Sequence, residues 1–244
     1  MKMIRIASLT IAVFGALICV AQSLHAFQPV RWSPMDAYIL KPLPGGPQSV
    51  QVLDPAGRVL SSARYIYDGA GRLIEERFAE ADGTPAGSNV YEYKAGRLQQ
   101  ERLIDAKGKI ISRTKFFYKN DVLVGMEQFD RNHKLISRQD YAYRDGRIYR
   151  GVETTGAQKD QFQLEYKDDK PIALTVKNNE HGRLNLITYQ YDEQGRTRQR
   201  IREAFGNFSR CDYSYDERGR IQAYAYYNRV NGEWEREKKL QFSY

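Results

Sequence analysis

The sequence predicts an all-β protein built from tandem antiparallel β-hairpin repeats. An aromatic-x-Tyr tripeptide recurs about every 25 residues, turn residues arrive about every 12–13 residues, and polar and apolar positions alternate between the turns. Strands of about 7–9 residues fit between such turns, whereas helical repeats need longer units. We expect about 15–16 strands in one long, twisted sheet that is rolled or partly barrel-like, because open sheets rarely exceed about ten strands.

The first 26 residues have the pattern of a secretory signal peptide. Lys2 and Arg5 give a positively charged start, and an apolar run follows over residues 6–20. Small residues then permit cleavage before Leu24 or before Phe27. The apolar run is shorter than the roughly 20 residues of a membrane helix, so an uncleaved anchor is the weaker alternative. We therefore expect an exported protein.

The rest of the chain divides into two parts. Residues 27–49 are rich in Pro and Gly and are expected to form a strap or linker, and residues 50–244 form the repeat domain. After removal of the signal peptide one cysteine is left, Cys211, which excludes a disulfide framework. The net charge of +8 hints at anionic partners, although 30 acidic residues are mixed with 38 basic ones.

The second tyrosine of each tripeptide marks the repeat. These residues are Tyr67, Tyr93, Tyr118, Tyr143, Tyr166, Tyr191, Tyr215 and Tyr244. The residue two positions earlier is aromatic in every copy except at Leu164, and residues two apart share one face of a strand. We expect the eight tyrosines to form the structural core of the repeat, each packed against its counterpart one unit along. An exposed carbohydrate-binding platform is the alternative.

A turn follows each of the first seven tripeptides. Five of these turns contain a Gly-Arg pair, at positions 71–72, 96–97, 146–147, 195–196 and 219–220. Asn120-Asp121 and Asp168-Asp169 stand in the other two. These residue types tolerate positive φ or form side-chain turns, so each position suits a tight hairpin.

Three of the turns, residues 67–72, 191–196 and 215–220, have the full pattern Tyr-Asp-x-x-Gly-Arg. This pattern resembles the YD repeat of the rearrangement-hotspot (RHS) family, and the resemblance covers about residues 50–244. It implies a β-shell; large members of the family enclose a toxic C-terminal domain. With its few repeats, this chain resembles a short member without a toxin domain. The MORN-like repeat is the alternative, but its units are shorter and richer in glycine.

The chain offers no recognisable catalytic or metal site. His133 and His181 fall in turns of different repeats, so neither a Ser-His-Asp triad nor a metal site is expected. Cys211 shares a face with Tyr213 and Tyr215 and is expected to be a buried, inert thiol. The glycines follow the repeat spacing rather than a phosphate-loop pattern. We expect no enzymatic activity and no cofactor.

One group of side chains suggests binding. Arg196, Arg198, Arg200 and Arg202 alternate along one predicted strand, and Arg210 lies on the next. The first four are expected to project from one face, and all five are candidates to contact a polyanion such as an acidic sugar or a lipopolysaccharide phosphate. A solvated face balanced by cross-strand carboxylates is the alternative.

These observations predict an exported, non-enzymatic binding or scaffold module, periplasmic or secreted, in or around a bacterial cell envelope. Its partner is expected to be a protein, a carbohydrate or another polyanion. Nucleic acid is not expected, because export removes the usual target, and no integral membrane span is expected after signal removal. The alternatives are an antitoxin-like or immunity-like protein and, less favoured, an enzyme with an unrecognised site.

Overall fold

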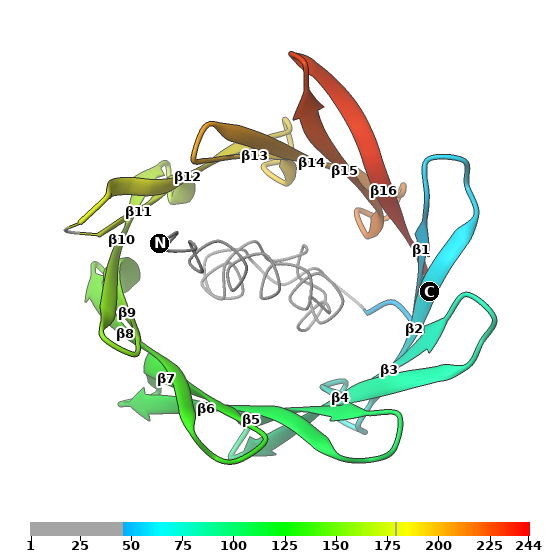
Figure 1. Ribbon diagram of the computed structural model, residues 1–244, viewed down its shortest axis with the longest axis horizontal. Helices are drawn as coiled ribbons and strands as arrows, with labels where there is room; N and C mark the ends of the chain where they lie inside the picture. Colours follow the sequence, from blue (N-terminus) through cyan, green and yellow to red (C-terminus); the bar gives the residue numbers. More distant parts are fainter. Residues whose placement is uncertain (1–45, 179) are drawn as a thin grey trace, which may run out of the picture.

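The computed structural model describes residues 46–178 and 180–244, which form a closed barrel of sixteen antiparallel strands (Figure 1). The strands are β1 (Ser49–Leu53), β2 (Val59–Tyr67), β3 (Leu73–Glu80), β4 (Pro85–Lys94), β5 (Arg97–Asp105), β6 (Ile110–Lys119), β7 (Val122–Asp130), β8 (Leu135–Arg144), β9 (Arg147–Thr155), β10 (Gln158–Lys167), β11 (Lys170–Asn178), β12 (Gly182–Tyr191), β13 (Thr197–Ala204), β14 (Asn207–Tyr215), β15 (Ile221–Val230) and β16 (Glu233–Ser243). The predicted all-β hairpin architecture is confirmed, and the sheet closes completely. The predicted signal peptide, and the strap up to residue 45, lie outside the described residues.

Each strand pairs with its neighbours in the sequence, and one long-range pairing closes the ring. β1 pairs with β16, where Val50 lies opposite Phe242 and Val52 lies opposite Leu240. These four side chains lie on the same face as the aromatic residues of the repeat and belong with them to one apolar cluster. Closure therefore satisfies the hydrogen bonds of both edge strands and continues the apolar face across the seam.

The turns lie alternately at two rims. The tyrosine rim carries the turns that follow the aromatic-x-Tyr tripeptides, at residues 68–72, 95–96, 120–121, 145–146, 168–169, 192–196 and 216–220. The hairpin rim carries the connections from each odd-numbered strand to the next, among them residues 54–58, 131–134, 205–206 and 231–232. Figure 1 shows the hairpins of this second rim splaying away from the centre of the ring.

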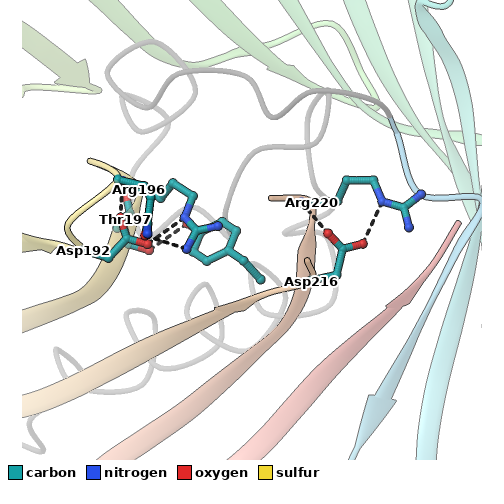
Figure 2. Close-up of polar contacts among 7 residues, drawn as sticks. Asp192, Arg196, Thr197, Asp216 and Arg220 are labelled. Carbon is teal, nitrogen blue, oxygen red and sulfur yellow. Dashed lines mark hydrogen bonds and ion pairs between the residues drawn. The ribbon is translucent and has the colours of Figure 1, made fainter. Parts of the chain in front are cut away.

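The aromatic face of the sheet is the inner face of the barrel. Figure 2 shows Arg196 and Arg220 inside the ring of strands, and Arg196 lies over the ring of Tyr215, 4.4 Å from its centroid. Tyr213 and Tyr224 on this face are buried, with ring centroids 4.9 Å apart in an edge-to-face arrangement. Side chains converge on the concave side of a curved sheet, so rings are buried there more completely than on the convex side.

The recurring tyrosines join each repeat to the one before it. The hydroxyls of seven of them donate hydrogen bonds of 2.6–3.0 Å to backbone carbonyls at the tyrosine rim, in the pairs Tyr67–Pro47, Tyr118–Leu98, Tyr143–Leu123, Tyr166–Ile148, Tyr191–Pro171, Tyr215–Thr197 and Tyr244–Ile221. The acceptor lies 18–23 residues earlier in the chain. The rings pack on the two apolar clusters of the inner wall.

The Tyr-Asp-x-x-Gly-Arg turns have a shared geometry. In the first of them Asp68 Oδ1 accepts hydrogen bonds of 2.9 Å from the amides of Ala70 and Arg72, and Asp68 Oδ2 accepts one of 2.7 Å from Arg72 Nε. The backbone hydrogen bond from Arg72, aided by its side chain, lowers the pKa of Asp68. Gly71 takes a φ of 76°, which the turn requires and which favours glycine. The same pattern occurs at Asp192 and Asp216 (Figure 2).

Two of the degenerate repeats replace the missing aspartate with one from the following unit. Arg97 forms an ion pair with Asp121, and Arg147 forms one with Asp169. In each case the guanidinium also lies over the recurring tyrosine of the next repeat, 5.8 Å from Tyr118 and 5.7 Å from the ring of Tyr166. The arginine after the turn glycine therefore keeps a carboxylate and a ring as neighbours in these repeats.

Candidate functional site

The structure separates the arginines that the sequence placed together. Arg200 and Arg202 lie on the inner wall. Arg200 is fully buried, and its guanidinium lies 5.9 Å from the ring centroid of Tyr213. Arg202 Nε donates a hydrogen bond of 3.3 Å to Asn185 Oδ1. Arg210 lies on the outer wall, because its neighbour Cys211 is the residue that faces Arg200 across the strands. The inner and outer residues cannot contact the same surface ligand.

The other two arginines lie at the tyrosine rim. Arg196 belongs to the turn and forms an ion pair of 2.6 Å with Asp192. Arg198 is the extra residue of a β-bulge, since Gln190 pairs with Gln199 and Tyr191 pairs with Thr197. A bulge changes the direction of its side chain, and Arg198 is exposed. The expectation that four arginines project together from one face is therefore wrong, and its physical cause is this bulge.

The outer wall near Arg210 carries a second pattern. An aromatic-x-Arg tripeptide occurs on three successive strands, as Phe208-Ser209-Arg210 in β14, Tyr227-Asn228-Arg229 in β15 and Trp234-Glu235-Arg236 in β16. Alternation turns the first and third residues of each tripeptide outward. The recurring aromatic-x-Arg tripeptide is therefore the sequence signal for this surface, and it is separate from the tyrosine repeat.

Antiparallel pairing converts the three tripeptides into an alternating grid of rings and guanidinium groups. Tyr227 lies opposite both Arg210 and Arg236, and Arg229 lies opposite Trp234. We call these five residues, together with Phe208, the arginine–aromatic surface. Each cation in it has aromatic neighbours, and each ring has cationic ones.

Contacts within the arginine–aromatic surface hold the side chains in place. The Arg210 guanidinium lies 4.2 Å from the ring centroid of Tyr227 and 4.9 Å from that of Trp234, and it forms an ion pair of 3.1 Å with Asp212. The guanidinium of Arg229 lies 5.5 Å from the ring of Phe208. Each cation–π contact contributes about 0.5–1 kcal/mol at an exposed site. These contacts place Arg210 and Arg229 against the neighbouring rings.

An exposed phenylalanine extends this surface at the hairpin rim. Phe205 occupies the turn between β13 and β14 with 76% of its surface exposed and a φ of 50°. A bulky residue is unfavourable in this left-handed conformation, and the equivalent positions of other two-residue turns hold Ala95, Asn120, Asp145 and Asn231. Val230 at the neighbouring hairpin tip is 40% exposed. Phe205 therefore exposes an apolar ring to water and also adopts a strained backbone conformation.

The remaining groups singled out by the sequence lie apart from this surface. His133 and His181 occupy turns, as predicted, and Cys211 is fully buried on the inner wall. Burial raises the pKa of the Cys211 thiol to about 12, so the group is a neutral thiol at physiological pH.

Within residues 46–178 and 180–244, no three His, Cys, Asp or Glu side chains are arranged to hold a metal ion. The described chain also has no helix with the length and apolarity needed to cross a membrane.

Fold and surface together define the class: a closed, sixteen-stranded, antiparallel β-barrel with an aromatic inner wall and a charged outer wall. In comparisons with known proteins, no family model matches the sequence, and no curated protein matches it. Among solved structures, a porin-like protein from Bacteroides uniformis ATCC 8492 is similar, with a TM-score of 0.52 and 13% identity, covering 81% of this chain and 96% of that chain. A porin-like protein from Bacteroides vulgatus ATCC 8482 has a TM-score of 0.36 and 9% identity, over 81% of this chain and 98% of that chain. The first likeness shows the barrel fold.

Proposed function

We propose that this chain is a short YD-repeat protein, exported to the periplasm or the medium, that binds an acidic carbohydrate without catalysing a reaction. The arginine–aromatic surface on β14–β16 carries the proposal. The repeated Asp–Arg turns favour the YD-repeat assignment, because they give the shared Tyr-Asp-x-x-Gly-Arg pattern one geometry.

The chemistry of the surface fits a sugar polymer with repeated negative charges. Guanidinium groups bind carboxylate and sulfate oxygens through paired hydrogen bonds. Aromatic rings pack against the C–H faces of sugar rings through apolar contact. Across the strands, each row alternates one kind of group with the other: Arg210, Tyr227 and Arg236 in one row, Phe208, Arg229 and Trp234 in the next. A polymer whose charged groups alternate with apolar sugar faces matches such rows.

Binding of polygalacturonate tests the ligand class. We expect the double variant Arg229→Glu and Arg236→Glu to bind polygalacturonate about tenfold more weakly than the wild type in calorimetric titration, because two exposed cations become anions. We also expect binding to weaken as sodium chloride is added. Neutral dextran of similar length should bind far more weakly than the charged polymer.

A matched control lies on another part of the outer wall. Arg64 and Arg77 are exposed and lie opposite each other on β2 and β3. The double variant Arg64→Glu and Arg77→Glu makes the same change in net charge, and we expect it to retain affinity within about twofold, since it touches no ring of the surface. An equal loss in both variants, or tighter binding of a single-stranded oligonucleotide than of polygalacturonate, contradicts the proposal.

The periplasmic or secreted location is supported by the outer wall. Charged side chains face outward in the middle of strands β2–β9 and β14: Arg64, Glu75, Glu92, Arg102, Arg113, Glu127, Arg138, Asp140, Arg150, Arg210 and Asp212. An arginine or lysine on a lipid-facing strand costs about 2–4 kcal/mol at the bilayer midplane. The wall is therefore suited to water, even though a solved barrel of similar fold is named porin-like.

Flotation tests this location. We expect the exported chain, prepared without detergent, to stay in the lower fractions of a density gradient containing phosphatidylethanolamine–phosphatidylglycerol vesicles, and to be monodisperse in size-exclusion chromatography. An outer-membrane porin added to the same vesicles in detergent and then dialysed serves as the positive control. Recovery of this chain with the floating vesicles in high salt contradicts the aqueous location.

A further inference from the structure

A pocket on the outer wall of β5–β7 is separate from the arginine–aromatic surface. Its volume is about 420 Å³, and it is lined by Gln100, Arg102, Arg113, Lys115, Phe129 and His133. These strands lie across the ring from β14–β16 (Figure 1). The volume falls in the range of pockets that hold small molecules, roughly 300–1,000 Å³.

The pocket concentrates positive charge on two strands. Arg102 lies opposite Arg113, and Gln100 lies opposite Lys115, so three cations occupy four adjoining positions of the wall. Like charges that face each other across strands destabilise a sheet. On the other side of β6 the charges alternate instead: Lys115 lies opposite Glu127 on β7, and Glu127 lies opposite Arg138 on β8, 3.7 Å from it.

The cations of the pocket are only partly neutralised by the protein. Arg102 forms an ion pair with Glu92. Arg113 Nη1 lies 2.6 Å and 2.8 Å from the two ring nitrogens of His133, and Lys115 Nζ lies 5.2 Å from the ring centroid of Phe129. Among the described residues, no carboxylate forms an ion pair with Arg113 or Lys115. The pocket therefore holds two cations that lie beside the rings of His133 and Phe129.

We propose that this pocket is a second binding site, specific for a tetrahedral oxyanion such as a phosphate group. A planar carboxylate is bound by one guanidinium fork, whereas here Arg102, Arg113 and Lys115 approach from two strands and different positions along them. A phosphate presents oxygens in several directions and carries up to two charges at neutral pH. Its binding relieves the repulsion between the facing arginines.

Thermal unfolding with inorganic phosphate tests the assignment on the exported chain in buffer of about 10 mM ionic strength, where screening is weak. We expect phosphate to raise the Tm of the wild type, while potassium chloride at matched ionic strength does not. In calorimetry, the double variant Arg113→Gln and Lys115→Gln should bind phosphate at least about tenfold more weakly. The single variant Lys115→Gln, which changes only an exposed side chain, should also bind more weakly and guards against misfolding of the double variant.

Three results overturn the proposal. These are an equal Tm increase with chloride, an unchanged phosphate affinity in both pocket variants, or tighter binding of glucuronate than of phosphate. The control Arg64→Gln and Arg77→Gln removes another facing pair of arginines and should retain the phosphate response. Because this site shares no residue with the arginine–aromatic surface, polygalacturonate binding succeeds or fails independently of it.

Discussion

Replacement of Gly151 by valine is expected to destabilise the barrel by about 3 kcal/mol or more, a large share of the 5–15 kcal/mol that holds a typical domain together. Gly151 lies on the inner wall between Tyr141 and Phe162. A Cβ atom at this position would lie 2.5 Å from the carbonyl oxygen of Asp140 and closer still to the ring of Phe162. The carbonyl belongs to the neighbouring strand and cannot move without breaking the ladder, so the ring and backbone must both shift.

Urea unfolding followed by circular dichroism measures this effect. Gly69→Ala is the matched control, because Gly69 has no atom within 4 Å of the added Cβ and does not adopt positive φ. The control is expected to unfold within about 0.5 kcal/mol of the wild type. Equal stability of Gly151→Val and the wild type would show that Phe162 does not cover Gly151.

Alkaline pH is expected to unfold the barrel between about pH 10 and 12. Burial raises the pKa of Tyr65, Tyr213, Tyr224 and Tyr226 well above 10, so these phenols stay protonated in the folded chain. In the unfolded chain they ionise near pH 10. A raised pKa of an acid means that its stabilising effect is complete below the unfolded value and is lost as pH rises above it. Each such tyrosine then removes about 1.4 kcal/mol of stability per pH unit.

Two measurements together check this pH dependence. The free energy of urea unfolding should be flat from pH 7 to 9 and should fall steeply above pH 10, and absorbance at 295 nm should show tyrosinate appearing together with the loss of β-sheet dichroism. The variant Tyr224→Phe should have a shallower slope above pH 10, since one buried phenol is gone. Tyrosinate formation at pH 11 with unchanged sheet content and stability would contradict the burial of these hydroxyls.

The strands and turns were predictable because their causes are local. Alternation along a strand and a turn residue at each end specify a hairpin within about 25 residues, and Tyr67 to Tyr244 mark the same point of every unit. Closure of the ring was only partly predictable. It depends on the accumulated twist and tilt of the whole sheet and on the pairing of Val50 with Phe242, which a local pattern does not encode.

The candidate site was predicted less well than the fold. Alternation placed Arg198 with Arg200, but a bulge at Arg198 changed its direction. The same bulge recurs in the other repeats, directly after the residue that pairs with the recurring tyrosine, and simple alternation does not reveal it. The direction in which the sheet curves decided that Arg200 is buried inside the barrel. The grid around Arg210 arises from cross-strand register, which fixes which aromatic-x-Arg tripeptides meet. Register over three strands is a tertiary property.

The ion pairs of Arg97 with Asp121 and of Arg147 with Asp169 make the repeats dependent on their order. A unit that lacks its own motif aspartate needs a particular successor, whereas units with the full motif are self-sufficient at this turn. Duplicating or shuffling single hairpin pairs would therefore not be neutral, even though all units share one geometry. Each of these two ion pairs requires an aspartate at a fixed position of the following unit. The pairs therefore constrain how such a chain can lengthen by duplication.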